Sequence, residues 1–332
     1  MLSSPRAAVS AAFLIHSTVS GTWAPRLPAI KESLGLSDGE LGTALVGLAI
    51  GLLVGTRLAG APVDRFGSRP VMRVGFPLLA ATLVLPGLAD SLVTLLLSLF
   101  VLGLASGALD VAMNAQGIEV ERQLGRPILS GLHGLWSIGL GLGAGVAALS
   151  AALDIDPLEQ FAVVAAVLAV ASVVFLRGLL AAQRPAPGEP EEEGVTVRWT
   201  LALALLGVIA FCSFVGEGSA SDWSAVYMTQ ELGTSQALGA VAFAAFAVTM
   251  ATTRFVVDPL RGRLVGRVAT LGYVGSVAGP IMIGWLAEAS SLRASLGLVV
   301  LLALLIAVSA GASATSAQGE GSRLEQPGGL DS

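Results

Sequence analysis

The chain has 332 residues, of which 54% are hydrophobic and only 12% are charged, and its mean hydropathy is +0.81. This composition excludes a soluble globular domain and is typical of a protein with many membrane-spanning helices. The net charge of −5 provides no basic surface for a nucleic acid, and a single cysteine, Cys212, excludes an internal disulfide and a cysteine-based metal site.

Ten segments are apolar and long enough to cross about 30 Å of hydrocarbon as helices. They lie near residues 8–28, 40–60, 72–90, 93–117, 129–151, 160–181, 200–221, 237–257, 268–288 and 292–312. Because Arg6 precedes the first apolar run, that run could be taken for a secretory signal peptide, but nine further segments favour a first membrane helix. The predicted fold class is an all-α polytopic membrane protein.

The segment between the sixth and seventh spans is rich in proline and glutamate, which predicts a solvated linker. The predicted organisation is an N-terminal six-helix bundle (1–182), a cytoplasmic linker (183–198), a C-terminal bundle of four helices (199–312) and a disordered tail (313–332). Fifteen of the 18 lysines and arginines lie on the side of the N-terminus, the exceptions being Arg26, Lys31 and Arg293. The positive-inside rule therefore predicts cytoplasmic termini.

The two halves repeat each other. Trp23, Leu34-Gly35-Leu36-Ser37 and Leu41-Gly42 recur about 200 residues later as Trp223, Leu232-Gly233-Thr234-Ser235 and Leu238-Gly239. At the fifth helix the offset falls to 141, where Arg126, Gly131 and Gly134 match Arg267, Gly272 and Gly275. Just before this break the offset is near 194, because Asp64, Gly67 and Arg69 recur loosely as Asp258, Gly262 and Arg263. The offset therefore falls by about 53 residues, which is the length of two membrane helices with a short turn. The second half is therefore predicted to lack the counterparts of helices 3 and 4, with the break after Asp258.

Between the second and third spans the chain reads Gly60-Ala61-Pro62-Val63-Asp64-Arg65-Phe66-Gly67-Ser68-Arg69. This stretch resembles the G-x-x-x-D-R-x-G-x-R signature loop of the major facilitator superfamily. The resemblance implies a transporter of two helical bundles, in which charges of this cytoplasmic loop hold the halves in one conformation. Gly60, Asp64, Arg65, Gly67 and Arg69 would form this conformational switch, with the glycines allowing close backbone approach. The alternative is that the charged residues are simply solvated.

Four stretches, within residues 23–30, 110–117, 221–227 and 269–280, make the chain most similar to the MosC/YbjJ-like branch of bacterial inner-membrane proteins in this superfamily. That resemblance implies a polar solute such as a sugar, a cyclitol or an amine. Helix 5 lacks the Gly-Pro pair of the drug/proton antiporters, so drug efflux is a weaker hypothesis. Two histidines and one cysteine are too few and too scattered for an enzyme or metal site.

Six residues are candidates for binding the solute or a coupling proton: His16, Trp23, Asp110, Asn114, Gln116 and Glu217. Asp110 is the strongest, because an ionised carboxylate inside a helix costs about 2.5–3.5 kcal/mol and normally faces a cavity or a partner. Asn114 follows one turn later on the same face. A structural hydrogen bond is the alternative for Asp110, and Gln116 lies nearer the cytoplasmic end.

His16 and Trp23 share a face of the first helix, and histidine can titrate near neutral pH. A buried structural histidine is the alternative for His16, and exposure to periplasmic water is the alternative for Glu217 with Asp222. His133 and Trp136 are expected to be packing residues. Trp223 and Tyr227 are candidate anchors at the level of the lipid headgroups.

The leading hypothesis is a transmembrane transporter that moves a small polar solute by alternating access, without a cofactor or a chemical reaction. Protons are a candidate coupling ion, and the oligomeric state is left open. The second hypothesis is a non-transporting remnant or interaction protein that keeps the carrier scaffold.

Overall fold

The computed structural model describes residues 4–181, 201–257, 281–302 and 304–306, and regular structure in these segments is helical throughout. The predicted linker, the tail and the break after Asp258 lie outside the described residues. The first half contains α1 (Pro5–Trp23), η1 (Ala24–Arg26), α2 (Leu27–Leu34), α3 (Asp38–Phe66), α4 (Ser68–Thr82), η2 (Leu85–Leu88), α5 (Leu92–Leu124), α6 (Leu129–Ala152), α7 (Pro157–Phe175) and η3 (Leu176–Gly178). The second half contains α8 (Leu201–Gln230), α9 (Gln236–Val257) and helical residues 281–289 and 292–306.

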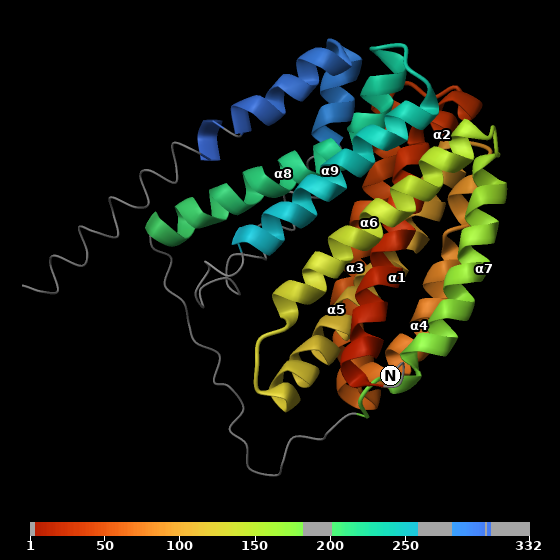
Figure 1. The fold of residues 1–332 in the computed structure, drawn as a ribbon. Helices are drawn as coiled ribbons and strands as arrows, with labels where there is room; N and C mark the ends of the chain where they lie inside the picture. Colours follow the sequence, from red (N-terminus) through yellow and green to blue (C-terminus); the bar gives the residue numbers. More distant parts are fainter. Residues whose placement is uncertain (1–3, 182–200, 258–280, 303, 307–332) are drawn as a thin grey trace, which may run out of the picture.

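The long helices run up and down between two ends of the molecule (Figure 1). The N-terminal end holds the start of α1 and the α3–α4 junction; the opposite end, here called the far end, holds α2 and the α8–α9 turn. Five of the described helices, α3 to α7 with η2 and η3 continuing α4 and α7, satisfy the length and hydropathy of a membrane span. The all-helical fold predicted from the apolar segments is thereby confirmed.

Local sequence signals set the helix ends. Ser37 and Ser91 form capping boxes at the starts of α3 and α5, in which the serine side chain accepts a backbone N–H three residues later. Gly35 and Gly125 end α2 and α5 in the left-handed region, with φ of 63° and 61°, a conformation that glycine adopts without a steric penalty. These signals keep the turns short, so consecutive helices are antiparallel neighbours.

Two helix pairs of the first half are interlocked through glycines. A Cβ added to Gly51 of α3 would lie 2.1 Å from the carbonyl oxygen of Phe100 in α5, and one added to Gly107 of α5 would lie 2.2 Å from that of Leu52 in α3. A Cβ added to Gly21 of α1 would likewise lie 2.0 Å from the carbonyl oxygen of Leu140 in α6. Such approach is typical of membrane helices, whose association depends on van der Waals packing rather than on the hydrophobic effect.

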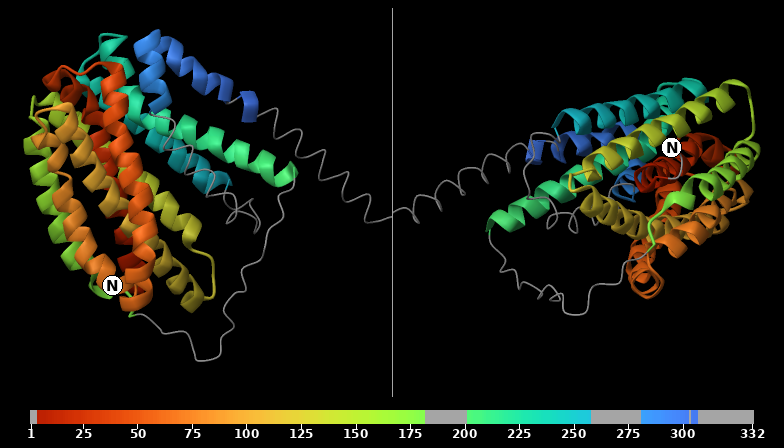
Figure 2. Two further views of the ribbon diagram at one scale, coloured as in Figure 1. Left: turned by 180° about the vertical axis from the view of Figure 1, so that it is seen from behind. Right: turned by 60° about the horizontal axis from the view of Figure 1, so that its bottom comes forward.

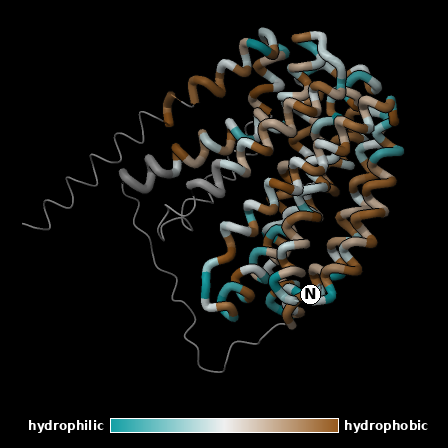
Figure 3. Tube along the Cα trace, in the orientation of Figure 1, coloured by the Kyte–Doolittle hydropathy of each residue, from teal (hydrophilic) through white to brown (hydrophobic). Residues whose placement is uncertain are grey.

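The outer faces of the bundle are apolar along most of their length (Figure 3). Val74 of α4 and Val163 of α7 are 64% and 65% exposed, values that would be unusual over so wide a surface in a soluble protein. Hydrophilic residues gather mainly at the two ends (Figure 3). The hydrocarbon of a bilayer therefore fits around these faces.

The repeat predicted between the halves appears in the backbone at the far end. Gly35 and Gly233, which are 198 residues apart, both have a φ of 63°. Ser37 and Ser235 have the same separation, and each hydroxyl accepts the backbone N–H three residues later. The start of α9 is therefore the structural counterpart of the start of α3.

Candidate functional site

A cavity of about 370 Å³ lies between the first half and helices α8 and α9, within the usual size range of small-molecule sites. In the first half, α1, α3, α5 and α6 contribute to its wall. The aromatic lining residues are Phe13, Trp23, Trp136, Phe214, Phe243 and Phe246. The polar lining residues are His16, Ser20, Ser106, Asp110, His133, Glu217, Ser221 and Asp222.

His16 is the centre of a hydrogen-bond network that joins three helices of the first half. Its Nδ1 accepts the indole N–H of Trp136 at 3.3 Å, and its Nε2 lies 3.1 Å from the backbone oxygen of Ser106 and 3.0 Å from the Ser106 hydroxyl. An indole N–H can only donate, so Nδ1 carries no proton here and Nε2–H donates to the Ser106 carbonyl. This arrangement holds His16 as the neutral imidazole.

Asp110 follows Ser106 by one turn of α5 and lines the same cavity. Its Oδ1 accepts the side-chain amide of Asn114 at 3.2 Å, while the same amide donates to the backbone oxygen of Asp110 at 2.9 Å. Asn114 thus orients the carboxylate from its own helix and does not itself line the cavity. Asp110 thus lines the cavity and is held by a hydrogen bond within its own helix, and its role in binding stays a prediction.

Helix α8 brings two more carboxylates to the wall, Glu217 and Asp222. Asp222 is only 9% exposed, and its carboxylate accepts the Ser221 hydroxyl at 3.4 Å, a distance at the weak end of the range. Neither arginine nor lysine occurs among the described residues that line this cavity. The described part of the wall therefore carries three carboxylates, Asp110, Glu217 and Asp222.

Four of the six residues predicted for the site meet in this cavity: His16, Trp23, Asp110 and Glu217. Gln116 lies elsewhere: it is 1% exposed and accepts the hydroxyl of Ser68, at the α3–α4 junction. Glu217 and Asp222, for which exposure to periplasmic water is the alternative, both line this cavity on α8, which continues beyond them to Gln230.

Sequence reasoning missed Asp222, His133 and Trp136 as cavity residues. The spacing of His133 and Trp136, three residues apart in a helix, places them on one face, and this signal was available in the sequence. What the sequence does not give is that this face of α6 turns toward α1, where Trp136 reaches His16.

At the far end, the two halves are joined by hydrogen bonds. The ammonium group of Lys31 in α2 donates to Asp38 of α3 and to the side-chain oxygen of Gln230 in α8. The backbone N–H of Gly39 donates to Glu288 at 2.9 Å. A Cβ added to Gly284 would lie 2.7 Å from the Cα of Gly42, so backbones of the two halves also touch. The cavity is therefore closed from this end.

Toward the N-terminal end, α8 runs away from the first half as it approaches Leu201 (Figure 2). The residues of the predicted switch lie at this end. Asp64 and Arg65 belong to the last turn of α3, and Gly67, with a φ of 83°, is the junction to α4. The predicted ten-residue loop is thus mostly helix, a correction that follows from the continuation of α3 through Pro62 to Phe66.

Gly60 also differs from expectation, because a Cβ added there would meet no atom within 4 Å. Close backbone approach is therefore not its role in this conformation. Among the described residues, the salt bridges are Lys31–Asp38 and Glu119–Arg122, neither of which involves the switch residues; Arg65 instead lies 5.2 Å from the ring centroid of its neighbour Phe66.

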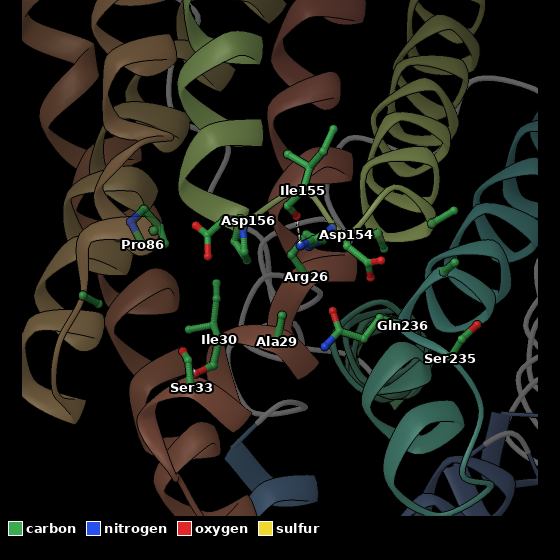
Figure 4. A pocket seen from close by; sticks show the side chains of 16 residues that line it. Arg26, Ala29, Ile30, Ser33, Pro86, Asp154, Ile155, Asp156, Ser235 and Gln236 are labelled. Atoms are coloured by element: carbon green, nitrogen blue, oxygen red, sulfur yellow. Dashed lines mark hydrogen bonds between the residues drawn. The ribbon is translucent and has the colours of Figure 1, made fainter.

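A second cavity, of about 680 Å³, opens at the far end between the α6–α7 turn and the start of α9. Arg26 stands near its centre and donates from Nη2 to the backbone oxygen of Ile155 at 2.7 Å (Figure 4). Although larger, this cavity lies beside the connecting turns and is lined by residues of loops, of helix ends and of the short helix α2. The smaller central cavity is the candidate site, because helices of both halves line it at mid-length.

Two helical halves around a shared cavity, with apolar outer faces, define the class of polytopic membrane carriers. The family model of the major facilitator superfamily matches residues 9–261, and the chain belongs to that superfamily. It is therefore a multi-pass membrane transporter protein rather than an enzyme, as its sequence predicts.

Three curated relatives support this assignment. An uncharacterised transporter of the same family from Yersinia pestis is 28% identical over 361 aligned positions, covering 90% of this chain and 93% of the relative. An uncharacterised transporter of Sinorhizobium fredii is 33% identical, covering 78% and 68%. The membrane protein MosC of Rhizobium meliloti is 29% identical, covering 82% and 65%.

Solved structures share the fold at low sequence identity. The nucleoside transporter NupG has a TM-score of 0.62 at 13% identity, covering 92% of this chain and 98% of NupG. A bacterial homologue of the human lysosomal transporter Spinster, solved inward-facing and occupied, has a TM-score of 0.59 at 16% identity, covering 90% and 77%. These similarities establish the fold alone.

The alignment with the Yersinia protein is longer than this chain. Ninety per cent of 332 residues is about 299, so about 62 of the 361 aligned positions have no residue here. That number is close to the length of two membrane helices with a turn.

Proposed function

We propose that this transporter carries a small polar solute across the bacterial inner membrane by alternating access, with the central cavity as its binding site. The observation that carries the proposal is the position of this cavity: helices of both halves line it, and hydrogen bonds between the halves close it at one end. A rocking motion that breaks these bonds would expose the same cavity to the other side.

The proposed orientation places the N-terminal end in the cytoplasm, as the distribution of arginines predicts. In that orientation the described conformation is closed toward the periplasm. The switch residues Asp64, Arg65 and Arg69 then lie on the cytoplasmic side, where they would find partners in the second half when that side closes.

The proposed solute is a sugar, a cyclitol or an amine-like molecule. Polar side chains such as Ser20 and Asp110 can hydrogen-bond such a molecule, while Trp23 and Trp136 offer flat surfaces against its apolar faces. Protons are the proposed coupling ion, since the ionisable side chains of Asp110, Glu217 and His16 line the same cavity.

The alternative proposal is a non-transporting remnant or interaction protein. It is supported by the positions that this chain lacks relative to its Yersinia relative. In the first half, α3 is packed against α5; in the second half, the counterpart of α5 is proposed to be missing, so one wall of the cavity would be open to lipid. An occluded state needs closure on all sides.

Reconstitution into liposomes decides between the two proposals. Uptake and efflux of sugars, cyclitols and amines are measured, with and without a proton gradient, for three proteins: the 332-residue chain, the chain carrying the two-helix segment of a full-length relative after Asp258, and Asp110→Asn. Gradient-dependent transport by the unmodified chain that Asp110→Asn abolishes or uncouples supports the carrier. Transport only after the insertion supports the remnant. Parental transport by Asp110→Asn at normal expression would assign Asp110 a structural role.

A further inference from the structure

Arg26 brings hydrogen-bond donors to the far end that the described residues do not satisfy. Its side chain is 3% exposed, and its Nη2 donates to the backbone oxygen of Ile155 at 2.7 Å (Figure 4). Its Nε and Nη1 are buried and have no hydrogen-bond partner among the described residues. A buried donor without an acceptor has lost the hydrogen bonds that water would provide, which costs free energy. The guanidinium group of Arg26 is therefore only partly satisfied in this conformation.

The neighbouring carboxylates do not supply the missing acceptors. Asp156, in the α6–α7 turn, accepts the backbone N–H of Leu158 at 2.8 Å and so caps α7. Asp154 is exposed in the same turn, and neither of the salt bridges between described residues involves Arg26. Because both aspartates are exposed, water weakens their attraction for a more distant guanidinium group.

The second half of the molecule helps to bury Arg26. Arg26 belongs to η1, which contacts α8 and α9 of the second half as well as α6 of its own half. Ser235 and Gln236, at the start of α9, line the same cavity as Arg26 (Figure 4). The bond to Ile155, by contrast, lies within the first half. Separation of the halves would therefore keep that bond and let water reach Nε and Nη1.

A second buried donor lies where the two halves touch. The indole nitrogen of Trp223 in α8 is buried and has no hydrogen-bond partner among the described residues. A Cβ added to Gly284 of the second half would lie 3.1 Å from the ring of Trp223 and 2.7 Å from the Cα of Gly42 in the first half. Buried polar atoms without partners are few in native proteins, and one reason for keeping them is stored strain. Two such side chains occur at the far-end contact.

From these observations we infer that Arg26 opposes closure of the far end. In the closed conformation its two donors are buried without acceptors, and in the open conformation water satisfies them. The bonds from Lys31 to Gln230 and from Gly39 to Glu288 favour closure, so the two effects bring the energies of the closed and open states closer together. The inference rests on the proposed alternating access and adds a residue that sets its equilibrium.

Distances between the halves at the far end test the inference without requiring transport. Spin labels are attached at two exposed positions, Glu32→Cys in α2 and Glu231→Cys in the α8–α9 turn, in a Cys212→Ser background. Pulsed electron paramagnetic resonance in nanodiscs then gives the fractions of short and long distances. In protein that also carries Lys31→Gln, so that the open state is more populated, Arg26→Met is expected to reduce the long-distance fraction severalfold, because closure no longer buries unsatisfied donors. An unchanged long-distance fraction would overturn the inference.

The sign of the change separates this role from a purely structural one. If Arg26 only ties η1 to the α6–α7 turn through Ile155, Arg26→Met loosens the far end, and the long-distance fraction rises; that result would also overturn the inference. Arg26→Gln, whose amide can still donate to the Ile155 oxygen, provides the same measurement if Arg26→Met does not fold.

Arg293→Met is the matched control, because Arg293 is exposed near the same end, five residues after Glu288. It is expected to leave the distances unchanged, and an effect equal to that of Arg26→Met would refute the assignment to Arg26. If the long-distance fraction falls as expected but liposomes show no transport, the role of Arg26 stands and the carrier proposal fails. Transport by a protein whose distances do not respond to Arg26→Met would have the opposite meaning.

Discussion

Single glycines determine how closely the helices of the first half approach. A methyl group added to Gly51 would lie 2.1 Å from the carbonyl oxygen of Phe100, far inside the van der Waals distance, and the obstacle is backbone rather than a flexible side-chain end. Gly60 lies on the same helix nine residues later and meets nothing within 4 Å. The same residue type on one helix therefore has two different structural roles.

Gly51→Ala is accordingly predicted to lower the free energy of unfolding by about 1–3 kcal/mol, because α3 and α5 must separate. Gly60→Ala is the matched control: with no clash, the better helix propensity of alanine leaves stability unchanged or raises it by up to about 1 kcal/mol. Thermal unfolding in detergent, followed by circular dichroism, measures both. Equal effects of the two substitutions would contradict the packing described for this pair.

At the scale of elements, α2 and the start of α3 form the contact that closes the far end. Lys31 is 6% exposed and bonds at once to Asp38 of its own half and Gln230 of α8. A buried ammonium held between two acceptors contributes more than an exposed ion pair, because removing one member leaves buried polar groups without a partner. This bond is made only while the halves touch.

Lys31→Gln is therefore predicted to open the far end more often. In a Cys212→Ser background, a cysteine replacing the cavity residue Ser20 should react roughly tenfold faster with an impermeant reagent supplied from the far side, as expected for the loss of about 1.4 kcal/mol. Arg122→Gln is the control, since Arg122 pairs with Glu119 on its own exposed helix surface. An unchanged or slower reaction in Lys31→Gln would mean that the bond does not hold this end closed.

At the scale of the whole molecule, the second half is proposed to be shorter than the first. The 198-residue spacing of Ser37 and Ser235 matches Gly47 and Gly51 of α3 to Ala245 and Thr249 of α9. Both of these α9 residues are exposed, whereas Gly47 and Gly51 are buried against α5. In α3 this face packs against α5. The corresponding face of α9 carries side chains instead of glycines and is not packed closely against any described helix.

Removing two spans preserves the side on which the chain ends, so both termini and the linker are predicted to be cytoplasmic. In intact cells of a Cys212→Ser strain, Glu192→Cys should react with an impermeant maleimide only after the inner membrane is permeabilised. Asp154→Cys, in the exposed α6–α7 turn at the far end, is the control and should react without permeabilisation. Reaction at position 192 from the periplasm would refute this topology.

Much of the site could be predicted from helical spacing, and the remainder depends on neighbours. His16 with Trp23, and Asp110 with Asn114, share faces that the period of 3.6 residues reveals. Gln116 is two residues beyond Asn114 and therefore turns toward Ser68 instead. The position of Asp222 in the cavity could not be predicted, because the sequence does not show where α8 crosses the bundle or how far it extends. Apolar segments were sufficient to predict the long helices that the structure describes, whereas the helical α3–α4 junction depends on where α3 ends.

The glycine contacts between α3 and α5 also bear on how this protein can evolve. Every amino acid that can replace glycine carries a side chain, and at Gly47, Gly51, Gly55, Gly103 and Gly107 any side chain would collide with a backbone carbonyl of the partner helix. Stepwise substitution at these five positions is therefore disfavoured, because a larger residue in one helix cannot be offset by a smaller residue in the other. We expect them to serve as a durable marker by which this helix pair can be recognised in descendants whose remaining sequence has diverged.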